Sequence, residues 1–315
     1  MSGGGSRAPA DRGAISTELR NPRTMDLHRL SAREVVERIQ SEDSAVLRAM
    51  EGARSELTAL IESAEAGFAA GGRLVYVGAG TSGRLGVLDA SEAPPTFQVE
   101  PDRVVGIIAG GDSALRKSSE HMEDDPEGAA GELRGLALTG RDTVIGLAAG
   151  GTTPYVRGAI GMAKELEPGC VTGFVTCSRV ETPAGTDHHV FLDTGPEVLT
   201  GSTRMKAGTA TKLALNTIST TLMIRTGRVH ENLMVDLRAT NEKLRDRAAR
   251  IVATLTGLTR GESLALLDRA GQEVKTAVVM ERLGVSASEA RGLLERRGGR
   301  LGGVLEGGGA EGGGS

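Results

Sequence analysis

Residues 73–84 read Arg-Leu-Val-Tyr-Val-Gly-Ala-Gly-Thr-Ser-Gly-Arg, a short apolar run followed directly by a loop of glycine and hydroxyl residues. Four further apolar, β-branched runs follow at residues 104–109, 143–149, 171–177 and 190–192. Most are separated by enough residues for a crossover helix, and continuous apolar runs suit strands that are buried on both faces. This pattern predicts an α/β fold with a doubly wound, mostly parallel sheet, whose ligand sites lie beyond the carboxyl ends of its strands.

Helices are predicted before and after the sheet region in the sequence. Before it, Ser31-Ala-Arg-Glu34 has the form of a capping box that starts a helix, and a second amphipathic helix is expected over residues 43–69. After about residue 227 we expect no further strands. The helices expected there are a long one over 233–255 and shorter ones near 262–270, 272–283 and 286–296.

These patterns divide the chain into five expected parts. They are a loose N-terminal arm (1–30), helices that pack on the sheet domain (31–63), the sheet domain (64–227), a small C-terminal helical bundle (228–299) and a Gly-rich disordered tail (300–315). The tail is assigned on its glycine content alone.

Composition excludes several classes of protein. With 37 basic and 41 acidic residues the net charge is −4, which provides no basic surface for nucleic acid or an anionic membrane. No apolar run approaches the roughly 20 residues that span a bilayer. The two cysteines, Cys170 and Cys177, fit a reducing cytoplasm and exclude a disulfide framework and a cysteine zinc site, while the adjacent His188 and His189 point to opposite faces of a strand and do not chelate one metal. With no Trp, two Tyr and four Phe, the chain is expected to hold any sugar by polar groups rather than by stacking.

The first candidate binding loop consists of Gly80, Thr81, Ser82, Gly83 and Arg84. Its glycines formally match the G-x-G-x-x-G dinucleotide fingerprint, but a chain with 46 glycines would contain about one such match by chance. The acidic residue expected about 20 residues further on is also poorly placed. Backbone N–H groups at a helix N-terminus and the two hydroxyls favour a phosphomonoester, with a dinucleotide or a plain tight turn as the alternatives.

A second loop of the same kind follows the third expected strand. It contains Gly151, Thr152 and Thr153, with Pro154 near the first position of a helix. Two such loops at adjacent strand ends would converge on one phosphate. The alternative is an ordinary helix N-cap formed by either threonine.

Two acidic residues are candidates for acid/base chemistry. Glu92 stands before Pro94-Pro95, which are expected to end the helix and leave Glu92 at an irregular position facing a ligand. Glu123 lies in an acidic cluster beyond the second strand. One carboxylate from each of two successive strand–helix connections is what paired acid/base catalysis needs, whereas a solvated surface is the alternative for each.

A third polar segment precedes another expected helix and contains Glu197, Ser202, Arg204 and Lys206. An arginine and a lysine two residues apart at a helix start are electrostatically out of place, because the helix dipole favours anions there. We therefore expect that they either hold a ligand anion or pair with Glu197.

Taken together, these segments resemble the N-acetylmuramic acid 6-phosphate etherases, a family of the sugar isomerase (SIS) fold, and their relative the glucokinase regulatory protein. The resemblance covers the chain from about residue 16 to about residue 297. Its marks are Thr17-Glu-Leu-Arg-Asn-Pro, Gly78-Ala-Gly-Thr-Ser-Gly-Arg-Leu-Gly, Asp89-Ala-Ser-Glu-Ala-Pro-Pro-Thr, Gly201-Ser-Thr-Arg-Met-Lys-Ala-Gly-Thr and Asn232-Leu-Met-Val-Asp-Leu-Arg-Ala-Thr-Asn-Glu-Lys-Leu.

The resemblance implies cleavage of the D-lactyl ether of N-acetylmuramic acid 6-phosphate to N-acetylglucosamine 6-phosphate and D-lactate, in cytoplasmic recycling of cell-wall amino sugars. It places the two functional glutamates at Glu92, as proton donor, and Glu123, as its partner acid or base. A base would remove the C2 proton of the open-chain sugar and an acid would assist departure of lactate from C3, before water adds at C3. Arg204 and Lys206 would hold ligand anions such as the lactyl carboxylate. No metal, nucleotide or flavin is implied as cofactor, and a homodimer with sites near the subunit boundary is expected.

One departure from the family bears on the phosphate site. The family usually has Ser-Gly-Arg-Thr-Pro-Tyr where this chain has Gly150-Gly-Thr-Thr-Pro-Tyr155, so that a hydroxyl is lost at Gly150 and a cation at Thr152. The alternative functions are a regulatory protein that senses a sugar phosphate without turnover, a SIS-type sugar phosphate isomerase and, more remotely, a dehydrogenase. Release of lactate would belong only to the etherase.

Overall fold

The computed structural model describes residues 12–237 and 242–307 and contains a five-stranded parallel sheet with the strand order β2-β1-β3-β4-β5. The strands are β1 (Leu74–Gly78), β2 (Val104–Ile108), β3 (Thr143–Leu147), β4 (Val171–Thr176) and β5 (His188–Phe191). Each lies within two residues of a predicted run. The predicted doubly wound α/β fold is confirmed.

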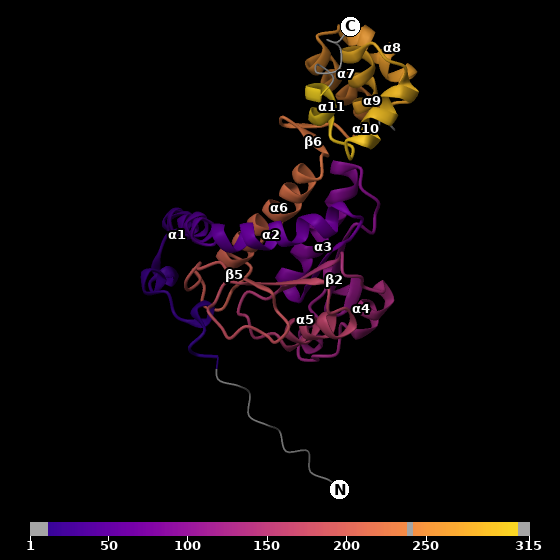
Figure 1. Cartoon of the computed structure of the whole chain (residues 1–315). Helices are drawn as coiled ribbons and strands as arrows, with labels where there is room; N and C mark the ends of the chain where they lie inside the picture. Colours follow the sequence, from indigo (N-terminus) through magenta and orange to yellow (C-terminus); the bar gives the residue numbers. More distant parts are fainter. Residues whose placement is uncertain (1–11, 238–241, 308–315) are drawn as a thin grey trace.

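Helices cover both faces of the sheet (Figure 1). On one face lie α1 (Ala32–Gly52), α2 (Arg54–Ala69), α3 (Gly80–Phe97) and α6 (Lys206–Arg225), and on the other α4 (Ala130–Leu136) and α5 (Pro154–Leu166). Successive residues of β1 alternate between the two cores: Leu74 and Tyr76 pack with the first group of helices, and Val75 and Val77 with the second. This three-layer arrangement leaves the strand ends and their loops at the surface.

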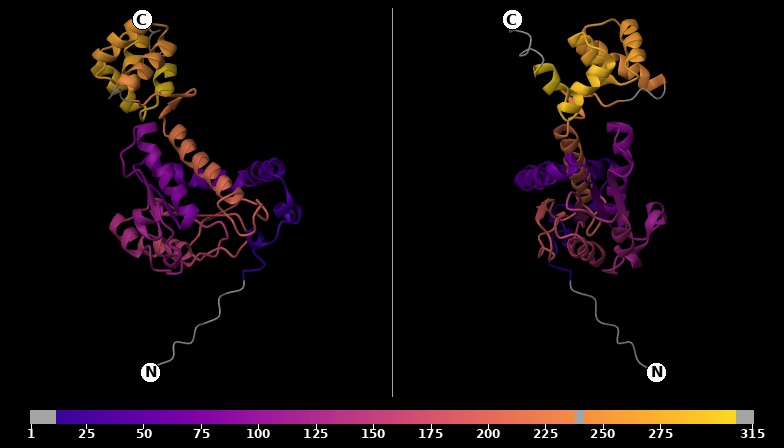
Figure 2. Two further views of the ribbon diagram at one scale, coloured as in Figure 1. Left: turned by 180° about the vertical axis from the view of Figure 1, so that it is seen from behind. Right: turned by 45° about the vertical axis from the view of Figure 1, so that its right-hand side comes forward.

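The C-terminal helices form a bundle with its own hydrophobic core. They are α7 (Glu242–Thr256), α8 (Arg260–Arg269), α9 (Val274–Leu283), α10 (Ala287–Arg296) and α11 (Leu301–Gly307). Figure 2 shows that α3 and α6 both run from the sheet towards this bundle.

Two C-terminal predictions are wrong. The long helix over 233–255 is replaced by an antiparallel pair, β6 (Val229–His230) and β7 (Leu233–Met234), followed by the shorter α7, because the chain turns at Glu231 with a φ of 53°. The tail is not disordered throughout, since α11 forms where Leu301 and Val304 can be buried. Residues 308–315 lie outside the described residues.

Two N-terminal predictions also change. The first helix continues to Gly52 and breaks at the buried Ala53, so no helix begins at residue 43; the capping box of Ser31 and Glu34 is confirmed. The expected loose arm is ordered from residue 12 and contains the short 3-10 helices η1 (Ser16–Glu18), η2 (Pro22–Thr24) and η3 (Leu27–Arg29). Its polar side chains find buried partners: the Thr24 hydroxyl, for example, donates to the Val198 carbonyl over 2.8 Å.

Within the described residues, no helix combines the length and the apolar character needed to cross a membrane.

Candidate functional site

The sheet has a topological switch point between β1 and β3. These strands are neighbours, but β1 continues into α3 on one face of the sheet and β3 leads to α5 on the other. The loops that follow them therefore diverge at the carboxyl ends of the strands, and in open α/β sheets the crevice at such a point is where ligands bind. The first and second predicted loops lie on either side of this crevice.

The first loop presents the N-terminus of α3 to the crevice. No side chain caps this helix, whose N-cap residue is Ala79. Gly83 serves packing rather than ligand contact, because a Cβ there would lie 2.8 Å from the Gly78 carbonyl oxygen and 2.7 Å from Ile108. Thr81 and Ser82 are left to supply hydroxyls beside the free backbone N–H groups.

The second loop presents the N-terminus of α5 in the same way. Pro154 occupies its first turn, and the Thr153 hydroxyl makes no capping hydrogen bond, so the capping alternative is not realised for Thr153. Gly151 has a φ of 75° and a Cβ there would overlap Val180. Arg157 holds the loop by donating to the Gly151 carbonyl over 3.2 Å.

Glu123 lies between the two loops. Its carbonyl accepts the N–H of Tyr155, in the first turn of α5, over 3.0 Å. Its carboxylate reaches the start of α3, where Oε1 lies 3.2 Å from the position that a Cβ on Gly80 would take. Because Gly80 has a φ of 51° and no side chain, it leaves this space to the carboxylate. The Glu123 carboxylate thus lies at the start of α3, while its backbone is joined to the first turn of α5, so the residue adjoins both candidate loops.

Glu92 is elsewhere, and its predicted irregular position is wrong. The helix α3 continues to Phe97 with Pro94 and Pro95 inside it. Both prolines fall near its C-terminal end, where few backbone hydrogen bonds are lost, and Ala93 stays packed in the core. Glu92 follows Gly80 by twelve residues, which at ~1.5 Å per residue is about 18 Å along the helix. One chain therefore does not bring Glu92 and Glu123 together.

A buried aspartate, Asp89, fixes the position of the helix that carries Glu92, and no role was predicted for it from the sequence. Asp89 accepts hydrogen bonds from the Tyr76 hydroxyl and the Asn216 amide, each over 2.9 Å, and from Ser219 over 3.2 Å. This network ties α3 to β1 and α6, so that Glu92, one turn later, is held on the exposed side of α3. No local signal marks Asp89, because Asn216 is 127 positions away.

The third segment does not supply the cation expected from Lys206. The Glu197 carboxylate accepts the backbone N–H groups of Lys206 (3.0 Å) and Ala207 (2.9 Å) and so caps α6, and burial raises the pKa of Glu197. The Lys206 Nζ lies 3.0 Å from the Glu42 carboxylate, and Lys206 is fully buried. The prediction that Lys206 holds a ligand anion is wrong for this structure, because Glu42 already neutralises it.

The other residues of this segment lie at the surface or near the first loop. Arg204 is exposed and Ser202 is half-buried. The turn they occupy leads to Gly208, where a Cβ would lie 3.3 Å from the Thr81 methyl carbon, so the segment adjoins the first loop. Arg84 is half-buried and donates to the Lys117 carbonyl over 3.1 Å.

Comparisons with known proteins identify relatives that cover nearly the whole chain. The family model described as the N-terminal SIS domain of glucokinase regulatory protein matches residues 54–164. A protein of Crocosphaera subtropica is 48% identical over 95% of this chain and 97% of its own length, and one of Gloeobacter violaceus is 49% identical over 94% and 96%. A protein of Serratia proteamaculans is 48% identical over 92% of this chain and 97% of its own. All three relatives are named N-acetylmuramic acid 6-phosphate etherase.

Proposed function

The chain belongs to the family of N-acetylmuramic acid 6-phosphate etherases, and we propose that it cleaves the D-lactyl ether of this sugar phosphate in amino sugar recycling. The observation that carries the proposal is the position of the Glu123 carboxylate at the start of α3, in the crevice between the two candidate phosphate loops. One small ligand could thereby bind its phosphate at the loops and meet an acid/base group at the same time.

The phosphate is proposed to bind between the N-termini of α3 and α5. No side chain caps α3, so its first N–H groups and its dipole are available to an anion. At α5 the dipole remains, but Pro154 has no N–H and the Tyr155 N–H already donates to the Glu123 carbonyl. Hydroxyls of Thr81, Ser82, Thr152 and Thr153 would add donors. The site would thus hold the phosphate largely by neutral groups.

The proposed chemistry is an elimination followed by a hydration, and each stage removes one proton and delivers one. A carboxylate takes the C2 proton of the open-chain sugar, and the C3–O bond then breaks as lactate leaves with a proton from an acid. Water adds at C3 of the resulting enal, and C2 regains a proton. We assign Glu123 as one of these groups and Glu92 as the donor to lactate, each contributing typically 10² to 10⁴-fold.

Because one chain separates these glutamates, we propose that Glu92 comes from a second copy in a homodimer. A twofold axis that passes beside α3, perpendicular to it and level with the midpoint between Gly80 and Glu92, would set Glu92 of the second copy opposite Gly80. The exposed side of α3 there carries Leu88, whose side chain is 50% exposed.

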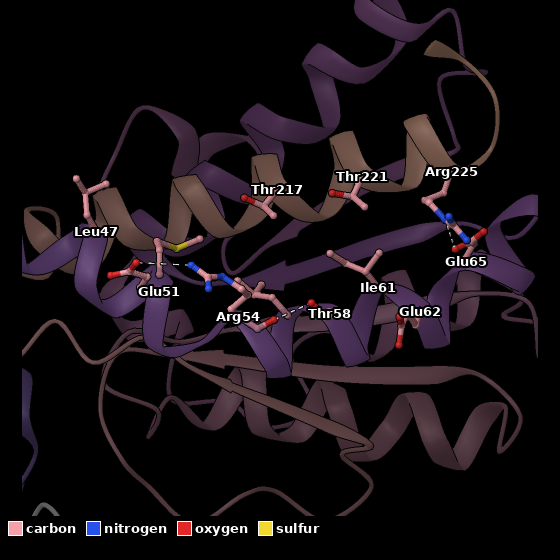
Figure 3. A pocket seen from close by; sticks show the side chains of 12 residues that line it. Leu47, Glu51, Arg54, Thr58, Ile61, Glu62, Glu65, Thr217, Thr221 and Arg225 are labelled. Carbon is pink, nitrogen blue, oxygen red and sulfur yellow. Dashed lines mark hydrogen bonds and ion pairs between the residues drawn. The ribbon is translucent and has the colours of Figure 1, made fainter. Parts of the chain in front are cut away.

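A separate groove lies among the helices on the same side of the sheet as α3. It has a volume of about 770 Å³, and α1 and α2 line it opposite α6 (Figure 3). Leu47 and Ile61 give it apolar surface, while Glu62, Arg54 and Arg225 give it both signs of charge. A surface that carries apolar side chains and both signs of charge is one that a second copy of the same surface could meet across a twofold axis.

The proposed compartment is the cytoplasm. Cys170 and Cys177 are both free and buried, and burial raises their pKa values to about 11 and about 12. Such thiols are protonated and unreactive, which suits a reducing compartment.

The decisive experiment measures D-lactate release from N-acetylmuramic acid 6-phosphate by the purified protein and by Glu123→Gln. We expect release by the wild type and a loss of at least about 100-fold in kcat for the variant, with binding of N-acetylglucosamine 6-phosphate retained. Binding without release by the wild type would instead favour a sugar-phosphate sensor. A ketose phosphate product would favour an isomerase.

A further inference from the structure

The short helix η1 is fixed against the end of β4 by buried hydroxyl groups. Thr17 is fully buried. The Ser16 hydroxyl donates to the Ser178 hydroxyl over 2.9 Å, and Ser178 donates in turn to the Thr17 hydroxyl over 3.2 Å. Ser178 lies just beyond the carboxyl end of β4, so η1 is held at the edge of the sheet that carries the candidate site.

The same segment touches the loops that line the crevice. A Cβ at Gly150, which precedes the second loop, would lie 3.8 Å from the Thr17 hydroxyl. The Thr17 carbonyl accepts the N–H of Gly201 over 3.1 Å. Gly201 begins the turn that leads to Gly208 beside Thr81. The N-terminal segment therefore continues the wall formed by the two loops and the start of α6.

Glu18 projects from this wall with a free carboxylate. Its Oε2 lies 3.0 Å from the position that a Cβ on Gly201 would take, and Gly201 has a φ of 75°, which favours glycine. Glu18 is exposed, and no group in the described part of the chain donates a hydrogen bond to its carboxylate. In contrast, the carboxylates of Glu42 and Glu197 accept hydrogen bonds from buried groups.

We propose that Glu18 is a substrate-binding residue whose carboxylate accepts hydrogen bonds from hydroxyl groups of the amino sugar phosphate. This rests on the function proposed above. Both tyrosines, Tyr76 and Tyr155, are buried and offer no ring for stacking, and a carboxylate can accept hydrogen bonds from the sugar hydroxyls. A carboxylate repels the phosphate and the lactyl carboxylate, so Glu18 selects the hydroxyl-bearing side of the ring and orients the substrate.

The test compares Glu18→Ala and Glu18→Gln with the wild type. Calorimetry measures affinity for N-acetylglucosamine 6-phosphate and for inorganic phosphate, and lactate release gives kcat and KM. Because a hydrogen bond to a charged group is lost, we expect Glu18→Ala to weaken sugar phosphate binding about tenfold or more and to raise KM, with inorganic phosphate affinity unchanged. Glu18→Gln, which keeps an acceptor, should lie between the two. Glu281→Ala, an exposed change on α9, is the matched control.

Two results would overturn the proposal. One is unchanged sugar phosphate affinity and KM in Glu18→Ala. The other is an equal loss of inorganic phosphate affinity with a lowered melting temperature in both variants, which would show that Glu18 only supports the loop. If the wild type binds the sugar phosphate but releases no lactate, the etherase proposal fails, while the binding data still decide the role of Glu18.

Discussion

At the scale of single residues, the start of α6 depends on a buried ionic network. Glu42 accepts hydrogen bonds from Lys206 Nζ (3.0 Å), Asn21 Nδ2 (2.7 Å) and Arg23 Nη2 (2.8 Å). Hydrogen bonds from Arg23 contribute most to lowering the pKa of Glu42, to about 2. Such a network is costly to break, because removing one partner leaves the other buried and uncompensated.

This network predicts an acid-sensitive stability. The folded-state pKa of Glu42 lies below 4.5, so its contribution to the free energy of unfolding is present above pH 4.5 and is lost as the pH falls towards about 2. Urea unfolding from pH 6 to 2 should therefore show a smaller pH dependence for Glu42→Gln than for the wild type. Glu37→Gln, at an exposed ion pair with Arg33, is the control. Parallel curves for Glu42→Gln and wild type would contradict the assignment.

Buried pairs such as Lys206 and Glu42 also show what could not be predicted from the sequence. The two loops were predicted as candidate binding segments from local signals: a strand end, a glycine and hydroxyls before a helix. Glu123 stood in an acidic cluster beyond a strand, and its functional role came from the family resemblance. Lys206 was misassigned because its partner, Glu42, is 164 positions away and only the fold brings them together. The same holds for Asp89 and Asn216.

At the scale of elements, the helix N-termini at the switch point decide what the site binds. The strands were predictable because a strand buried on both faces is apolar throughout, and the capping box of α1 was predictable because its partners are three residues apart. The ends of helices that depend on packing could not be predicted in this way. Ala93 keeps α3 in the core past Pro94, and no feature of the local sequence requires this.

A substitution in the loop before α5 is expected to tighten phosphate binding. The family usually has a serine and an arginine where this chain has Gly150 and Thr152, and a side chain at Gly150 would meet no atom within 3.4 Å. Thr152→Arg should tighten inorganic phosphate binding about tenfold at low salt, because it adds a charged donor, and the gain should shrink as salt rises. Thr152→Gln is the uncharged control in calorimetry. Equal effects of arginine and glutamine would show that residue 152 does not face the phosphate.

At the scale of the whole molecule, two bodies with separate cores are joined by α6 and the β6–β7 pair. Their separate cores support the proposed boundary near residue 228. The sequence predicts Glu92 and Glu123 in one site, but within one chain Glu92 lies about 18 Å along α3 from Gly80, beside which the Glu123 carboxylate lies. Assembly is a property that no local pattern encodes, so the site is proposed to be completed only when two copies meet.

A complementation experiment decides whether the two acids act across a dimer. Glu92→Gln and Glu123→Gln should each abolish lactate release as pure proteins. If Glu92 serves the site of the second copy, mixing equal amounts under conditions of subunit exchange gives mixed dimers in which one site keeps both glutamates. Activity should then recover to about a quarter of the wild-type value, since half of the dimers are mixed and half of their sites are intact. If both acids acted within one chain, every site would lack one of them, and the mixture would stay as inactive as its components.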